Sequence, residues 1–138
     1  MGTVTLRWVE GKLMVGTDTH NHSIVVGRSP ENQDEFVGMK PSDLLLIAAA
    51  ACASYDVIEI LAKQREPMQD FKVFCSGDQL PDPPYSFTCI QLHYLVYGQV
   101  NDERLKKAIQ LSEDKYCSVI STLRLGVPVT SDFEIIKT

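Results

Sequence analysis

Residues 42–67 read SDLLLIAAAACASYDVIEILAKQREP, a stretch that contains the longest apolar run in the chain. Every position from Leu44 to Ala53 is apolar or small, so that half of the segment should be buried on most faces of a helix. Ser42-Asp43 is typical of a helix start. The helix should stop near Arg65, because the residue before Pro67 avoids the α-helical conformation. The stretch therefore predicts a long central helix.

Short strands precede this helix. Residues 3–8 alternate between polar and apolar, which is typical of a strand with one buried face. Returning strands are expected over Leu13–Gly16 and Ser23–Gly27, and a loop over Ser29–Pro41. Three short strands are too few to be stable without something packed on them.

A second α/β unit should follow the central helix. Strand patterns cover Phe71–Gly77 and Tyr85–Tyr97, and a helix capped by Asn101 should reach Tyr116. A short helix over 118–125 and a closing strand over 127–137 complete the chain. The order β-β-β-α-β-β-α-α-β predicts an α+β fold, with the long helix packed on antiparallel sheets.

The composition of the chain argues against several classes of function. With 138 residues and 15.4 kDa, the chain is expected to form a single domain, residues 1–138. A net charge of −5 argues against a nucleic-acid or anionic-membrane partner, because no basic excess is present to neutralise phosphates. The longest apolar run is about half of a bilayer span. The start of the sequence does not resemble a signal peptide, so a cytoplasmic location is expected.

The chain has four cysteines, Cys52, Cys75, Cys89 and Cys117. Four are too few for a secreted disulfide scaffold of this length, and their spacing is not that of metal ligands, so no metal or cofactor is expected. Cys75 alternates with Phe71 and Val73 and is expected in the core. Cys89 is expected to be a partly exposed thiol that nothing nearby activates.

Cys52 should lie on the one polar stripe of the central helix. At 100° per residue, Asp56, Glu59 and Lys63 fall within about 40° of it. The opposite side carries Ile47, Val57, Ile58 and Leu61. A structural thiol would more often point to that apolar side, although a packed cysteine is also common. Both interpretations stay open, and Asp56 and Glu59 could be an acid/base pair or solvated surface.

Cys117 should lie between two helices. A thiol at the start of a helix has its thiolate favoured by free backbone N–H groups, and Lys115 could add to that effect. A simple packing role is equally open. His20 and His22 are a weak metal signal without a third ligand. Arg28 follows the third strand and, taken alone, is an ordinary surface arginine.

Two motifs resemble those of the OsmC/Ohr family. Residues 38–52, GMKPSDLLLIAAAAC, followed by Asp56-Val57, are similar to its central-helix signature. Residues 114–119, DKYCSV, look like its second-cysteine motif. The separation of the two cysteines, the order of elements and the chain length also fit, so the resemblance covers essentially the whole chain.

The resemblance implies a thiol-dependent peroxidase for organic hydroperoxides, built as an intertwined homodimer. In such proteins the cysteine matching Cys52 attacks the peroxide and becomes a sulfenic acid. The cysteine matching Cys117 resolves it as a disulfide, which an external dithiol reduces. This agrees with the chemistry that a low-pKa thiolate beside a second thiol can perform. Arg28 is the best match to the arginine that stabilises the thiolate.

The sequence also departs from the family pattern. Ser42 stands where typical peroxidases carry a glutamate, with Asp43 adjacent, and the first loop holds Asp18, His20 and His22 in place of glycines. Two other functions therefore stay open. One is a scaffold without strong peroxidase activity that binds a small apolar or thiol ligand between subunits. The other is a cysteine-ligated metal protein.

Overall fold

The computed structural model describes residues 2–28 and 35–138, so residues 29–34 of the loop expected over Ser29–Pro41 lie outside the described residues. The chain divides into two compact units, 1–45 and 46–138. One long helix, α1 (Pro41–Lys63), runs across the boundary between them.

The N-terminal unit is the expected three-stranded meander. β1 (Thr5–Glu10), β2 (Lys12–Thr17) and β3 (Ser23–Arg28) pair antiparallel in the order β1-β2-β3. Gly11 joins the first two strands with a φ of 55°, a left-handed conformation that glycine adopts without strain. Leu6 and Trp8 stay 61% and 71% exposed, so this sheet covers little of its own apolar surface.

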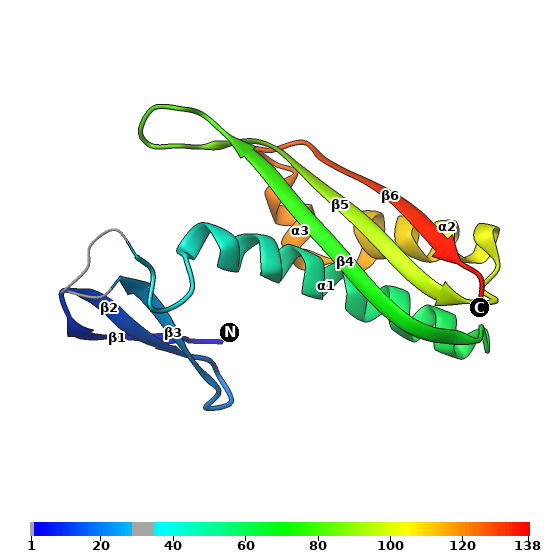
Figure 1. The fold of residues 1–138 in the computed structure, drawn as a ribbon, viewed down its shortest axis with the longest axis horizontal. Helices are drawn as coiled ribbons and strands as arrows, with labels where there is room; N and C mark the ends of the chain where they lie inside the picture. The colour runs from blue at the N-terminus through cyan, green and yellow to red at the C-terminus, as the bar shows by residue number, and fades with distance from the viewer. Residues whose placement is uncertain (1, 29–34) are drawn as a thin grey trace. The chain divides into compact units, whose positions relative to one another are not determined.

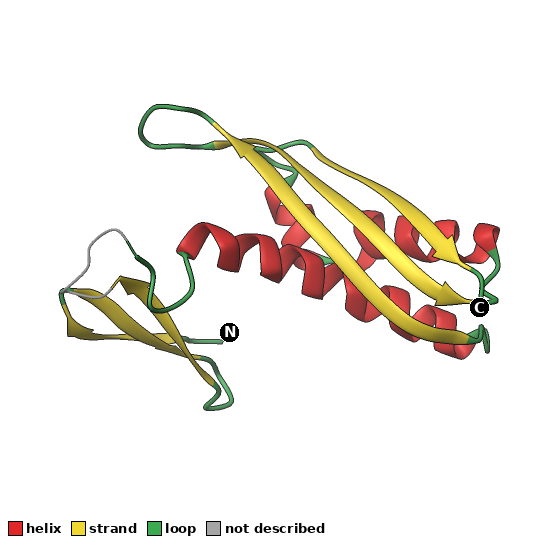
Figure 2. Ribbon diagram, viewed as in Figure 1, coloured by secondary structure: helices red, strands yellow, loops and turns green. Residues whose placement is uncertain are grey.

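In the C-terminal unit, helices cover one face of a second sheet (Figures 1 and 2). Its elements after α1 are β4 (Met68–Gln79), β5 (Phe87–Gly98), α2 (Asp102–Leu111), a π-helical turn η1 (Ser112–Tyr116), α3 (Ser118–Leu123) and β6 (Val129–Ile136). The α+β class and the order of elements are confirmed.

The second sheet is mixed, in the order β4-β5-β6. β4 and β5 are antiparallel as expected, but β6 runs parallel to β5, with Ile90 opposite Val129 and Val96 opposite Ile135. The expectation of wholly antiparallel sheets is corrected here. Helices α2 and α3 carry the chain back along the sheet after β5, so β6 enters from the same end, as a helical crossover allows.

The core of this unit lies between the sheet and the helices. Leu92, Tyr94 and Val96 of β5 point inward and are fully or almost fully buried. From α1, the residues on that side are Ala49, Ala53, Val57 and Leu61, which are also buried. The small side chains of the two alanines let the helix approach the packed elements closely.

Two apolar residues of α1 depart from the expected burial. Ile47 and Ile58 share the apolar side with Val57 and Leu61, but they are 47% and 41% exposed. The buried stripe of α1 is therefore narrower than its apolar sequence indicates, because among the described residues of the C-terminal unit one side of the helix is packed. Tyr55, 77% exposed, widens the remaining apolar surface.

α1 is also long and apolar enough to cross a membrane, judged by length and composition alone. A core helix passes the same test, and four regularly spaced α1 residues lie in the core cluster with β5. The packing identifies α1 as a core helix of this fold.

Candidate active site

Cys52 lies in the middle of α1, at the border between its buried and exposed sides. Its neighbours Ala49 and Ala53 are fully buried, whereas Cys52 itself is half-buried. Its Sγ atom is 4.0 Å from the hydroxyl oxygen of Ser118 at the start of α3. The interpretation of Cys52 as a thiol at the edge of the core therefore agrees with its surroundings.

Cys117 is positioned by an irregular turn that the sequence did not predict. The second helix was expected to reach Tyr116, but α2 ends at Leu111 and Ser112–Tyr116 forms a π-helical turn. The Cys117 amide donates to the Ser112 carbonyl at 2.7 Å and closes that turn. Single π-helical turns, which occur mostly inside α-helices, are frequent at functional sites.

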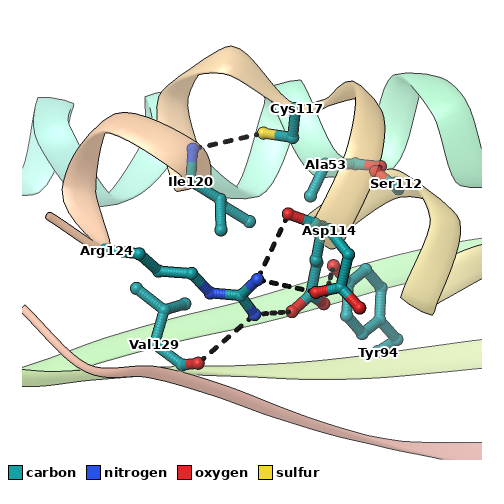
Figure 3. A network of polar contacts seen from close by, with 9 residues as sticks. Ala53, Tyr94, Ser112, Asp114, Cys117, Ile120, Arg124 and Val129 are labelled. Carbon is teal, nitrogen blue, oxygen red and sulfur yellow. Dashed lines mark hydrogen bonds and ion pairs between the residues drawn. The ribbon is translucent and has the colours of Figure 1, made fainter.

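Cys117 also begins the next helix. Its backbone is extended, with φ −79° and ψ 106°, and its Sγ atom accepts the Ile120 amide at 3.4 Å (Figure 3). The expected place of this thiol, between two helices and at a helix start, is confirmed. Cys117 is only 2% exposed, so its thiol faces the interior.

The two thiols interact, and the interaction separates their pKa values. Burial alone would raise the pKa of Cys52, but hydrogen bonds from the Cys117 thiol, from Ser118 and from the Val119 amide lower it below its usual value of 9.0. Burial and the hydrogen bond to Cys52 raise the pKa of Cys117 to about 11. The arrangement favours a Cys52 thiolate facing a protonated Cys117.

The turn that carries Cys117 is tied to α1 beside Cys52. The buried Ser112 hydroxyl donates to the Ala53 carbonyl at 2.7 Å and lies 3.5 Å from an Asp56 carboxylate oxygen. Asp56 therefore contacts this turn through Ser112. Glu59 forms an exposed ion pair with Lys63 at 3.0 Å, which fits a solvated helix surface rather than an acid/base role.

A buried carboxylate lies next to this site, and the sequence patterns did not mark it as a candidate. Glu113 is 4% exposed, and it accepts hydrogen bonds from Tyr94 of β5 and from Arg124 just after α3. Arg124 also contacts Asp114 and Val129 (Figure 3). The sequence offers one indication of its role, which is that Glu113 directly precedes the motif around Cys117.

The other two cysteines lie on strands of the second sheet, Cys75 on β4 and Cys89 on β5. Cys75 packs against the core from β4, and burial raises its pKa. Cys89 is half-buried and its thiol donates to Asp78 at 3.3 Å. Both positions agree with the roles expected from the strand pattern.

Arg28 belongs to the N-terminal unit. It ends β3, and its guanidinium lies over the Phe36 ring, 4.5 Å from the ring centroid. Its role at Cys52 stays a prediction. His22 pairs with Asp18 at 2.8 Å in the first loop. Within residues 2–28 and 35–138, no three His, Cys, Asp or Glu side chains gather closely enough to hold a metal ion.

Comparisons with known proteins identify relatives of the whole chain. The family model described as "OsmC-like protein" matches residues 31–132. "Protein YhfA" of Escherichia coli K12 is 32% identical over 133 residues, which are 95% of this chain and 96% of that protein.

Solved structures share the fold. A hypothetical protein from Aquifex aeolicus superposes with a TM-score of 0.89 at 25% identity, covering 100% of this chain and 98% of that one. A Legionella pneumophila protein described as an organic hydroperoxide resistance protein and predicted redox protein superposes with a TM-score of 0.71 at 15% identity, covering 97% and 96%.

Proposed function

The chain belongs to the OsmC-like family, and on that premise we propose that it is a thiol-dependent peroxidase that reduces organic hydroperoxides. The observation that carries the proposal is the hydrogen-bonded pair of Cys52, with a lowered pKa, and Cys117, with a raised one. The description of the Legionella relative as an organic hydroperoxide resistance protein supports the choice of substrate class.

In the first step the Cys52 thiolate attacks the terminal oxygen of the hydroperoxide. The O–O bond breaks, Cys52 becomes a sulfenic acid, and the alkoxide leaves as an alcohol after taking a proton. The peroxide is reduced by two electrons, which the sulfur supplies. A lowered pKa serves this step because the thiolate is the nucleophile.

In the second step Cys117 attacks the sulfenic sulfur. An S–S bond forms, and the sulfenic hydroxyl leaves as water with the proton of the Cys117 thiol. An external dithiol then reduces the disulfide by thiol exchange and is itself oxidised to a disulfide. The proximity of Cys117 supports its role as the resolving thiol, and the cycle requires no bound cofactor.

The proposal includes a homodimer in which the two units of each chain act as one OsmC-like domain. Exposed apolar side chains support it, among them Trp8 on β1 and Tyr55 on α1, because a partner chain would cover them. Arg28 is proposed to stabilise the Cys52 thiolate in that assembly. The need for a reducing dithiol supports a cytoplasmic location.

The test is peroxide consumption by purified protein with a dithiol reductant, comparing a bulky organic hydroperoxide with hydrogen peroxide. We expect faster turnover with the organic substrate. Cys52→Ser should abolish turnover, while Cys75→Ser and Cys89→Ser should leave it nearly unchanged. Turnover that survives Cys52→Ser would overturn the assignment.

A further inference from the structure

The buried carboxylate beside Cys117 has no part in the thiol chemistry described above. The Glu113 side chain is 3% exposed and is held by two partners. The Tyr94 hydroxyl donates to one carboxylate oxygen at 2.8 Å, and Arg124 donates to the other at 3.2 Å. Burial and the Glu113 charge raise the pKa of Tyr94 far above its usual value, so its hydroxyl stays a donor. Removing one partner from a buried ion pair is strongly destabilising, so this carboxylate depends on Tyr94 and Arg124.

Arg124 joins the segments on both sides of Cys117. One guanidinium nitrogen donates to the Glu113 carbonyl at 3.2 Å and to Asp114 at 2.8 Å. The other donates to the Glu113 carboxylate and lies 3.5 Å from the Val129 carbonyl at the start of β6 (Figure 3). These bonds join the two ends of the segment 113–124, which includes α3 and carries Cys117. We call Tyr94, Glu113, Asp114 and Arg124 the Arg124 cluster.

Ser112, the residue before Glu113, anchors this segment next to Cys52. The Ser112 hydroxyl donates to the carbonyl of Ala53, the residue after Cys52, at 2.7 Å. The Cys117 segment is therefore held to α1 through Ser112 and to β5 and β6 through the Arg124 cluster. These anchors restrict the movement of the segment that carries the Cys117 thiol.

From this arrangement we propose that Glu113 and Arg124 are positioning residues that hold the Cys117 thiol against Cys52. The inference rests on the proposed function, in which Cys117 resolves Cys52. Arg124 suits the task better than lysine would, because its planar guanidinium can bond several acceptors at fixed angles. Loss of the cluster leaves both thiols chemically intact but lowers their effective concentration toward each other.

The test measures disulfide formation without peroxide. The protein is equilibrated with mixtures of oxidised and reduced dithiothreitol, so that the protein dithiol and the oxidised reagent exchange into the protein disulfide and the reduced reagent. The Cys52–Cys117 disulfide is quantified by peptide mapping. We expect Glu113→Gln to lower the equilibrium constant at least tenfold, because a neutral amide holds the guanidinium less strongly than a carboxylate does.

Glu66→Gln is the matched control. The Glu66 side chain is 6% exposed and pairs with Arg104 at 3.0 Å, beyond the C-terminal end of α1. This variant weakens a similar ion pair at a distance from the thiols. Comparing its melting temperature with that of Glu113→Gln shows how much stability each variant loses. Its equilibrium constant should stay within twofold of the wild type. A fall equal to that of Glu113→Gln would overturn the proposal, as would an unchanged constant in Glu113→Gln.

Tyr94→Phe gives a milder second variant if Glu113→Gln does not fold. It removes one donor to Glu113 and keeps the aromatic ring in the core, and it should lower the constant at least threefold. An unchanged constant in that variant also counts against positioning. If the wild type forms the disulfide with oxidised dithiothreitol but not with peroxide, the peroxidase proposal fails. The change in the equilibrium constant between variants and wild type still tests the positioning role.

Discussion

The Sγ atom of Cys52 lies 4.0 Å from the hydroxyl oxygen of Ser118, the first residue of α3. Ser118 follows Cys117 directly, so one short segment brings two hydrogen-bond donors to the same sulfur. Together with the Val119 amide, these neutral groups lower the pKa of Cys52 against the opposing effect of burial. Hydrogen bonds to the charged form act in this direction because they stabilise the thiolate over the thiol.

Ser118→Ala should therefore raise the pKa of Cys52, by about half a unit to one unit. Below its pKa a thiol reacts through its small thiolate fraction, so the rate of Cys52 alkylation at pH 7 should fall about 3- to 10-fold. Above both pKa values the rates of variant and wild type should converge. The measurement is the pH profile of alkylation, with Cys52 identified by peptide mapping.

Ser54→Ala is the control for that experiment. The Ser54 hydroxyl donates to the Ala50 carbonyl on the same helix, at 2.6 Å. Removing it deletes a hydroxyl near Cys52 without deleting a donor to the sulfur. A profile that shifts equally in both variants, or in neither, would contradict the role given to Ser118.

Arg28→Ala should raise the Cys52 pKa and slow peroxide reduction more than tenfold, because a guanidinium near a thiolate stabilises it. Arg7→Ala, which removes an exposed arginine from the same small sheet, should leave the rate unchanged. Stopped-flow measurement of Cys52 oxidation at constant pH gives both rates. Equal rates for Arg28→Ala and the wild type would mean that Arg28 does not serve Cys52.

If the protein is a homodimer, light scattering at micromolar concentration should give a mass of twice 15.4 kDa. Ile58→Glu should lower that mass, because it places a charge on the exposed apolar side of α1. Phe74→Glu changes a side chain that is 57% exposed on the sheet face away from α1, and should keep the dimer. A monomeric mass for the wild type would contradict the dimer.

Strong local patterns made most of the fold predictable. The apolar stretch before Cys52 and the stop at Pro67 placed α1 to within two residues at its C-terminal end. The direction of β6 was not predictable, because alternation identifies a strand but does not record which way its neighbour runs. The exposure of Ile58 was not predictable either, because an apolar helix side looks alike whether its own chain or a partner covers it.

The site was predictable only where neighbouring residues carried the signal. The polar stripe on α1 and the helix-start position marked Cys52 and Cys117 as candidates. A packing role stayed open for both, and their roles as reactive and resolving thiols came from the resemblance to the OsmC/Ohr motifs. Glu113 and Arg124 could not be paired, because they meet only after the π-turn and α3 reverse the chain. That turn itself has no recognisable pattern, since its residues would also fit an ordinary helix.

Cys117→Ser should trap the cycle after its first step. Serine can still donate a hydrogen bond to the Cys52 thiolate, so the reaction with peroxide should proceed, but it cannot form a disulfide. Sulfenic acid should then accumulate on Cys52 and advance to sulfinic acid with excess peroxide. In the wild type one equivalent of peroxide should instead give a Cys52–Cys117 bond that dithiols reduce readily. Non-reducing peptide mapping and intact mass distinguish the two products, with Cys75→Ser behaving as the wild type. A wild-type Cys52 that stays a free thiol under peroxide, with no linked peptide, would favour a ligand-binding role for this scaffold over catalysis.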